Sequence, residues 1–380
     1  LQVQNCGRCH SRRRTLGEYH YGRSLTDTHL LAMLSPPLYH ADGQIRDEVY
    51  VYGSFIQSKM YAAGVVCTNC HEPHSNQLVA KDNALCTQCH NADSFDTPVH
   101  HRHATGTSGS ECVNCHMPEQ TYMGVDLRRD HSMRVPRPDL SETLGTPNAC
   151  TQCHLDRSDA WAAKAVEEWG IAKQKVESTV GELFFDARLG APDAFAGLET
   201  LAMNPNANGI WRGTAIEELG RQGVVGLEPL IARLVQSSDS IIRASAVRAS
   251  EALPLVQRYQ VLRPILGDKN RSVVTELATA LAAVPLDQID SGDASALENI
   301  FRAYLEIQLD DLDLPSVLLV LLLFYRFQHP RPLNNKYLLP IEPRLPDFSL
   351  SIGCSLPSFH HPHDQEPQRH LYCTNWQYRP

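Results

Sequence analysis

The spacing of apolar positions along the chain changes near residue 158. Before that point long helical periodicities are scarce, with short exceptions such as Leu25–Leu34. After it, apolar residues recur every three or four positions, as they do on one face of an α-helix. Trp161–Trp169 is the first amphipathic helix that this pattern predicts, and either Ser158 or Asp159 is placed to cap its start.

A weak internal repeat follows between residues 205 and 285. Ile210–Leu219, Ile241–Ser250 and Ser272–Leu281 align with one another at an offset of 31 residues. Leu227–Val235 and Tyr259–Leu266, which lie between these copies, are also amphipathic. One pair of helices per repeat at this period is typical of a helical solenoid, and the repeat resembles HEAT repeats. A helical bundle with accidental similarity is the alternative.

The last part of the chain is less regular. Phe301–Leu309 is helical in pattern, and Leu318–Tyr325 resembles part of a damaged tetratricopeptide repeat. The final residues have no periodicity and many Pro, His and Arg, so we expect a disordered or out-of-frame tail. The longest apolar run, Val317–Phe324, is far shorter than the roughly 20 residues that a membrane-spanning helix needs.

These patterns predict a mainly α-helical protein with much irregular structure. We expect four parts: a cofactor-packed domain at 1–157, a HEAT-like solenoid at 158–300, degenerate tetratricopeptide-like helices at 301–347 and the tail at 348–380. The formal net charge of −9 makes a nucleic acid or an anionic membrane surface a poor partner. No signal peptide precedes Leu1, and we expect the sequence to be incomplete at its start and altered near its end.

Cysteine and histidine carry the chemistry. Of 12 Cys and 18 His, ten Cys and thirteen His lie before residue 155. The ten cysteines form five Cys-x-x-Cys pairs, and a His directly follows each pair, which neither a disulfide framework nor a zinc or redox pair explains. The five motifs are Cys6–Cys9–His10, Cys67–Cys70–His71, Cys86–Cys89–His90, Cys112–Cys115–His116 and Cys150–Cys153–His154.

This spacing suits covalent attachment of haem. Two thiols separated by two residues reach the two vinyl groups of one porphyrin, and the adjacent His supplies the proximal iron ligand. The sequence therefore predicts five covalent haems c, attached by these ten cysteines and ligated by His10, His71, His90, His116 and His154.

Eight further histidines lie in the same region and are candidates for the sixth iron ligands. A single His in this region would most simply be a surface residue. Eight such histidines lie in a segment with five irons that need a sixth ligand, so we expect several of them to bind iron. The carboxylate of Asp130 is placed to orient the imidazole that follows it. Met117 directly follows His116 and cannot reach the opposite face of that haem. We select as distal ligands His40, His74, His100, His103 and His131.

Arginines cluster near the motifs at Arg12–Arg14, Arg128–Arg129, Arg134 and Arg137. They form either a solvated basic face or a set of partners for haem propionates, which a guanidinium suits through its fork of donors. The sequence leaves both alternatives open.

The order of motifs resembles known multihaem families. Cys112–Pro118, Asp130–His131, Pro136 and Cys150–His154 are similar to the closing part of the haem cores of cytochrome c nitrite reductases and hydroxylamine oxidoreductases. The whole of residues 5–320 more closely resembles bacterial multihaem cytochromes fused to HEAT and tetratricopeptide repeats. That resemblance implies His131 as a distal ligand, and His40, His74 and the pair His100 and His103 as further ligands. Nitrite reductases have Lys in one Cys-x-x-Cys-Lys motif, whereas all five motifs here end in His, which puts a nitrite-reducing site in doubt.

Three functions follow as hypotheses. The first is an electron carrier in which most haems have two His ligands. Its donors and acceptors would be redox proteins, and it could assemble into an oligomer or filament. The helical repeats would then be a docking or spacing module. The second is an enzyme, a multihaem oxidoreductase of a small nitrogen or sulfur oxyanion with one open-coordinate haem. The third is a scaffold with structural haems. Eight spare His for five irons favour the carrier. Haem c is attached outside the cytoplasm, so we expect a periplasmic or extracellular location.

Overall fold

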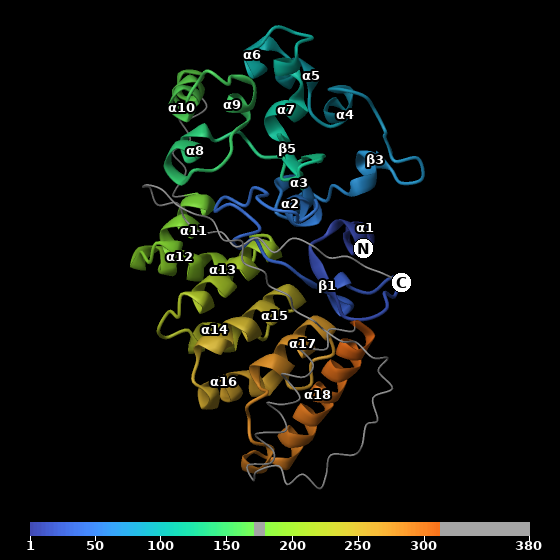
Figure 1. The fold of residues 1–380 in the computed structure, drawn as a ribbon, viewed down its shortest axis with the longest axis vertical. Helices are drawn as coiled ribbons and strands as arrows, with labels where there is room; N and C mark the ends of the chain where they lie inside the picture. Colours follow the sequence, from blue (N-terminus) through green and yellow to red (C-terminus); the bar gives the residue numbers. More distant parts are fainter. Residues whose placement is uncertain (171–178, 312–380) are drawn as a thin grey trace, which may run out of the picture. The chain divides into compact units, whose positions relative to one another are not determined.

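The computed structural model describes residues 1–170 and 179–311 (Figure 1). These residues lie in one compact unit, Leu1–Pro330. The described part is mainly helical with an irregular N-terminal region, which confirms the predicted fold class. None of its helices is long and apolar enough to cross a membrane. The predictions for Leu318–Tyr325 and for the tail at 348–380 lie outside the described residues.

The N-terminal region consists of short elements joined by turns. Three antiparallel pairs of strands, β1 with β2, β3 with β4 and β5 with β6, lie among the helices. In chain order the elements are α1 (Gln2–His10), β1 (Arg13–Thr15), β2 (His29–Leu31), α2 (Tyr52–Ile56), α3 (Lys59–Ala62), β3 (His71–Glu72), β4 (Gln77–Leu78), α4 (Ala84–Thr87), α5 (Ala92–Phe95), α6 (Pro98–His101), α7 (Cys112–His116), β5 (Glu119–Tyr122), β6 (Asp126–Arg129), α8 (Pro138–Leu144) and α9 (Ala149–Cys153).

Longer helices follow and pack one on the next. The strongest contacts join α12 to α13, α13 to α15 and α15 to α17, as expected for consecutive helical repeats (Figure 1). In chain order these helices are α10 (Asp159–Glu168), α11 (Val180–Arg188), α12 (Pro192–Met203), α13 (Gly209–Arg221), α14 (Glu228–Leu234), α15 (Ser240–Ala249), α16 (Leu255–Leu262), α17 (Arg271–Ala280) and α18 (Ser291–Asp311).

Helix caps confirm the pattern that predicted these helices. Ser158 caps α10, and its Oγ accepts a hydrogen bond from the backbone N–H of Trp161 at 3.2 Å. The repeated helices α13, α15 and α17 begin after Asn208, Asp239 and Asn270, which are again 31 residues apart. Asx side chains favour this position because their oxygen can accept from an otherwise unpaired N–H of the first turn. The repeat period is thus visible in the caps as well as in the apolar positions.

A buried ion network joins the three repeats. Arg248 of α15 donates to Glu217 of α13 at 2.7 Å and to Glu276 of α17. Burial raises the pKa of the Glu217 carboxyl, and the guanidinium opposes that effect. Burial alone would lower the pKa of Arg248, but the two carboxylates outweigh it and raise the pKa. The network holds the repeats in register.

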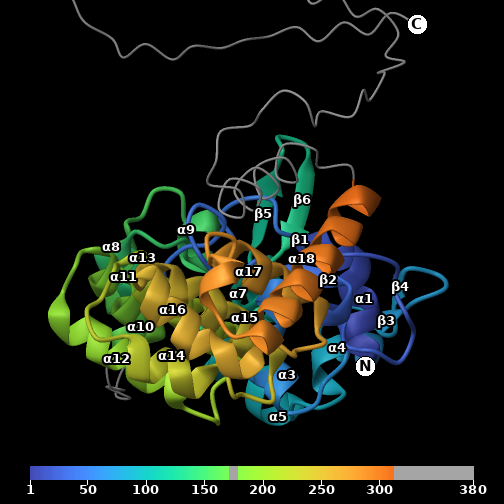
Figure 2. The ribbon, with the colours of Figure 1, turned by 90° about the horizontal axis from the view of Figure 1, so that it is seen from below.

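The repeats also share a core with the N-terminal region. Ile210 of α13 is buried in one apolar cluster with Leu34, Tyr39 and Phe55, and Trp211 and Ile241 pack on the same cluster. At the cap positions, Asn270 Nδ2 donates to Asp27 Oδ1 at 2.8 Å. Strands β1 and β2 lie beside α17 and α18 (Figure 2).

Hydrogen bonds also join the repeats to the N-terminal region: Thr26 bonds Ser240 and Asn270, the backbone N–H of Leu34 donates to Thr214, and Asn208 donates to the carbonyl of Ser58. The docking or spacing role of the repeats stays a prediction. The division at 157 and 158 stays a prediction, and the division expected after residue 300 falls inside α18.

Leu25–Leu34 also differs from its pattern. It forms a 3₁₀ turn at Leu25–Asp27 and then strand β2, because β1 offers a ladder of backbone hydrogen bonds to this segment.

Candidate haem-binding sites

The local structure of each motif brings its two cysteines to one side. Cys112–His116 is helix α7, and Cys150 and Cys153 lie on α9. Residues three apart on a helix share a face, so both thiols of a motif point the same way. All ten cysteines of the five motifs are free. The first, fourth and fifth motifs, which lie on α1, α7 and α9, therefore present both thiols on one face of a helix, as attachment to one macrocycle requires.

Burial sets the state of several thiols. Burial, with the neighbouring Cys6 adding to it, raises the pKa of Cys67 to about 12. Burial likewise raises the pKa of Cys86 and Cys115 to about 11. Redox-active Cys-x-x-Cys pairs depend on a depressed thiol pKa, so a thioredoxin-like dithiol is a poor description of these sites.

Consecutive motifs are neighbours in space, in the order of the sequence. Cys6 of the first motif lies close enough to Cys67 of the second to raise the pKa of that thiol. Cys89 of the third motif acts on the pKa of Cys70 in the same way. Cys112 of the fourth motif likewise raises the pKa of Cys86, and both cysteines of the fifth raise that of Cys115. The five attachment points thus form an unbroken series.

Three motif histidines have a second imidazole beside them. The ring centroids are 6.2 Å apart for His71 and His131, 6.1 Å for His100 and His116, and 6.1 Å for His103 and His154. Their planes are 21°, 15° and 36° from parallel.

These separations fit axial ligands of one iron. Metal–nitrogen bonds of about 2.0–2.1 Å on both sides of an iron, together with the rings' own size, place two ligand centroids about 6.3 Å apart. Three predicted distal histidines therefore lie at the distance that ligation of a shared iron demands.

Hydrogen bonds orient these imidazoles through Nδ1. His131 Nδ1 bonds the carbonyl of Arg129 at 2.9 Å, His116 Nδ1 that of Arg134 at 2.8 Å, and His103 Nδ1 that of His101 at 2.5 Å. A proton on Nδ1 leaves the Nε2 lone pair for the metal. The partner of His131 is thus a backbone carbonyl and not Asp130, whose Oδ1 instead accepts from the N–H of Ser132 at 2.8 Å.

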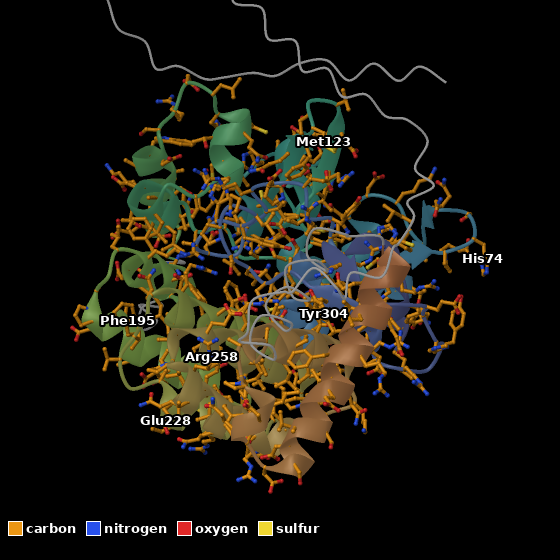
Figure 3. The ribbon with its side chains drawn as sticks, turned by 60° about the horizontal axis from the view of Figure 1, so that its bottom comes forward. His74, Met123, Phe195, Glu228, Arg258 and Tyr304 are labelled. Atoms are coloured by element: carbon orange, nitrogen blue, oxygen red, sulfur yellow. The ribbon has the colours of Figure 1, made fainter. Side chains whose placement is uncertain are left out.

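The other two predicted distal ligands have different surroundings. His74 has a side chain 92% exposed, and its Nδ1 lies 2.9 Å from Glu72 (Figure 3). His40 is half-buried, and burial lowers its pKa while Asp42 raises it. Among the described residues, no ring contact joins His40 or His74 to a motif histidine. Their ligation stays a prediction.

Aromatic side chains at the motifs were missed in the sequence. The ring of Trp161 lies 4.9 Å from that of His154, and Phe95 lies 5.9 Å from His90. Trp161 belongs to the predicted helix after the fifth motif, so its place beside that motif required the fold. Phe95 had no periodic pattern to mark it.

Apolar side chains near the motifs are unusually exposed. Twelve of the fifteen large exposed apolar residues of the described chain lie at or before Leu155. They include Leu78 and Val79 between the second and third motifs, and Phe95 and Val99 between the third and fourth. Contiguous exposed apolar surface marks a binding site, and a large flat macrocycle would cover it. The residues present therefore fit haem.

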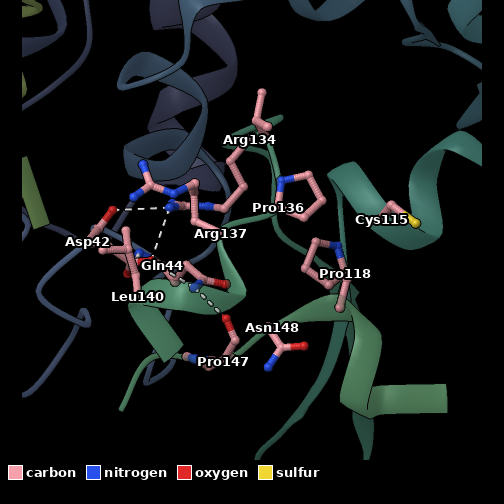
Figure 4. Close-up of a pocket in the computed structure, with 12 residues that line it drawn as sticks. Asp42, Gln44, Cys115, Pro118, Arg134, Pro136, Arg137, Leu140, Pro147 and Asn148 are labelled. Atoms are coloured by element: carbon pink, nitrogen blue, oxygen red, sulfur yellow. Dashed lines mark hydrogen bonds and ion pairs between the residues drawn. The ribbon is translucent and has the colours of Figure 1, made fainter. Parts of the chain in front are cut away.

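Four of these arginines, Arg128, Arg129, Arg134 and Arg137, form ion pairs with carboxylates. Arg128 pairs with Glu48 and Asp126, and Arg129 lies 2.9 Å from Glu119. Arg134 lies 3.3 Å from Asp42 in the wall of a cavity of about 40 Å³ (Figure 4). This cavity, between Cys115 and Asn148, has room for only a few waters. The expected partnership with propionates stays a prediction beside these ion pairs.

Comparison with known proteins agrees with this geometry. A family model described as a doubled CXXCH motif matches residues 59–95, which contain the second and third motifs. The chain is a c-type cytochrome. A model for HEAT repeats matches residues 188–282 of the cytochrome and confirms the solenoid prediction.

Two further comparisons concern solved structures and curated proteins. The cytochrome is similar to the outer cell wall cytochrome OcwA with a TM-score of 0.33 and 16% sequence identity. The match covers 66% of this chain and 64% of that one. A search of curated proteins found no match.

Proposed function

We propose that the cytochrome binds five haems c and passes electrons along them in the order of the sequence. The proximity of cysteines of successive motifs carries this proposal, because the first site lies near the second and so on to the fifth. Haem supplies a reversible one-electron couple when it is bound. The protein's part is to hold each site next to the following one.

The ligands belong to the same proposal. His131 is the distal partner of His71, His100 of His116, and His103 of His154, on the evidence of their separations. Burial lowers the pKa of His71, His100 and His131, which favours the neutral imidazole that binds a metal. Of the five other histidines of this region, we assign His40 and His74 to the irons of His10 and His90. Mostly bis-His ligation keeps the potentials low.

The setting follows from the cofactor. Because haem c is attached outside the cytoplasm, the cytochrome works in the periplasm or beyond the cell. Its partners are redox proteins that donate at one end of the series and accept at the other, and a larger assembly or filament would extend that series. The helical repeats support the first sites by packing against the N-terminal region that contains them.

Removal of the middle site tests the relay. A ruthenium photosensitiser placed by Tyr21→p-azidophenylalanine, beside Arg8 of the first motif, injects electrons at that end. His103→Met marks the fifth site, because His/Met ligation raises its potential. We expect Cys86→Ala with Cys89→Ala to slow reduction of the fifth site at least tenfold.

The control is Cys150→Ala with Cys153→Ala, made without the His103→Met marker, which should leave reduction of the first four sites unchanged. Unaltered reduction of the fifth site without the third would contradict a relay in sequence order.

A further inference from the structure

Phe95 lies between histidines of two different sites. Its ring centroid is 5.9 Å from that of His90, the proximal residue of the third motif, at an interplanar angle of 88°. It is 5.4 Å from the ring of His100 at 90°. The ring of His100 in turn lies 6.1 Å from that of His116, the proximal residue of the fourth motif. One phenyl ring therefore makes edge contacts with imidazoles that belong to successive sites.

The local sequence fixes Phe95 in this place. It ends α5, which begins after Asn91, whose side chain accepts from the N–H of Ser94 at 3.2 Å. Pro98 then starts α6, on which His100 lies, and α5 and α6 pack together (Figure 1). A proline in the first turn suits a helix because its fixed φ is already helical.

Asn83 ties this segment to the fourth motif. Its Nδ2 donates to Asp96 Oδ1 at 2.8 Å, directly after Phe95. Its Oδ1 accepts from the N–H of Cys112 at 3.0 Å. The position of the phenyl ring relative to the fourth site is thus set by hydrogen bonds on both sides.

Core packing does not account for Phe95, because its side chain is 46% exposed. Its ring contacts in the described part of the chain are with the two imidazoles. Perpendicular contacts of this kind are favoured because the positive edge of one ring meets the negative face of the other. They resist rotation of the imidazole about its own axis.

We propose that Phe95 is a positioning residue of the relay, which holds the plane of His100 nearly parallel to that of His116 and packs the gap between the third and fourth sites. This inference rests on the proposed function. The angle between His100 and His116 is 15°, the smallest of the three pairs, and that pair is the one with a perpendicular aromatic neighbour on its distal ring.

Electron paramagnetic resonance of the oxidised, haem-loaded cytochrome tests this role. The g-values of a low-spin ferric haem depend on the angle between its two imidazole planes. Phe95→Leu should shift one low-spin signal and slow electron passage from the third site to the fourth severalfold, at an unchanged ratio of haem to protein. Phe95→Tyr keeps the ring and should retain the wild-type g-values and the wild-type rate. Phe195→Leu, a partly buried Phe of the repeats, is the control and should change neither (Figure 3).

The outcomes separate the two claims. A Phe95→Leu protein that retains wild-type g-values and rates would overturn the role of Phe95, even if the wild type shows a working relay. A wild type without low-spin signals would instead defeat the proposed function. If Phe95→Leu loses haem, Phe95→Met replaces it as an unbranched apolar side chain without a planar edge, and unchanged g-values there would likewise overturn the inference.

Discussion

His71 and His131 come from distant parts of the sequence, yet their ring centroids lie 6.2 Å apart and their planes are 21° from parallel. The first follows a Cys-x-x-Cys pair and the second follows hairpin β5–β6, which ends at Arg129. The carbonyl of Arg129 accepts from Nδ1 of His131, which leaves the Nε2 lone pair free. The hairpin thus brings a predicted distal ligand next to the proximal residue of the second motif.

Gly7 should be intolerant of a side chain. A Cβ at this buried position in α1 would lie 2.7 Å from both Leu25 and Tyr52. Overpacking of this kind costs roughly 1–3 kcal/mol. We expect Gly7→Ala to lower the melting temperature and the haem occupancy of the first site, as measured by calorimetry and by mass. Gly267→Ala, which meets no atom within 4 Å, is the control. Equal values for the two variants would argue against a packed first motif.

Arg248 should be essential to the repeats. Arg248→Met leaves Glu217 and Glu276 buried without their cation, a change that costs roughly 3–5 kcal/mol of unfolding free energy. Burial raises the folded pKa of Glu217, so its unfavourable effect is absent at low pH and grows as the pH rises. The deficit measured by denaturant unfolding should therefore be smaller at acid pH than at neutral pH.

Arg233→Met is the matched control for this change, because Arg233 is exposed on α14. A deficit that did not depend on pH would show that lost packing of the side chain, and not charge, explains the result.

Asn270 should couple the repeats to the haem region. Asn270→Ala removes the cap of α17, worth about 1 kcal/mol, and also the bonds to Thr26 and Asp27. Thr179→Ala removes a cap of α11 without such bonds. In denaturant titrations, Asn270→Ala should shift both the helical signal and the haem absorbance, and by more than Thr179→Ala does. An unshifted haem transition would mean that the two regions unfold independently.

His29 should make the first region sensitive to acid. Burial, with Arg13 and Arg8 adding to it, lowers the pKa of His29 to about 4. Its neutral form therefore contributes stability that is complete above about pH 6.5 and is lost as the pH falls through about 4. The stability difference between wild type and His29→Gln should shrink over this window. His20→Gln, at an exposed position, should show no such trend. A constant difference for His29→Gln would contradict the neutral assignment.

The sequence could predict the repeats because their signals are local. The apolar stripe and the N-cap residues Asn208, Asp239 and Asn270 each belong to one helix, and both recur at an offset of 31 residues. It could not predict that Ile210 and Ile241 join a core with Leu34, because that contact depends on how the helices are stacked.

Some features of the haem-binding sites could be predicted from the sequence, and others depended on the tertiary structure. Covalent attachment could be read from Cys-x-x-Cys-His because the chemistry needs that spacing within five residues. The pairing of each predicted distal histidine with a motif histidine depended on tertiary structure, as His103 and His154 illustrate. His101 lies two residues before His103 and makes a different hydrogen bond, because its Nδ1 accepts from the N–H of His103 at 3.2 Å and its proton therefore lies on Nε2.

Spin quantitation of the oxidised cytochrome by electron paramagnetic resonance, against a haem count from the pyridine haemochrome assay, tests the central claim most directly. The account predicts five haems per chain, with low-spin ferric signals that amount to at least three of them and that fall by one in each of His100→Ala, His103→Ala and His131→Ala. Three or fewer haems per chain, or a mainly high-spin spectrum that disappears on addition of nitrite or hydroxylamine, would contradict the relay and favour a reductase.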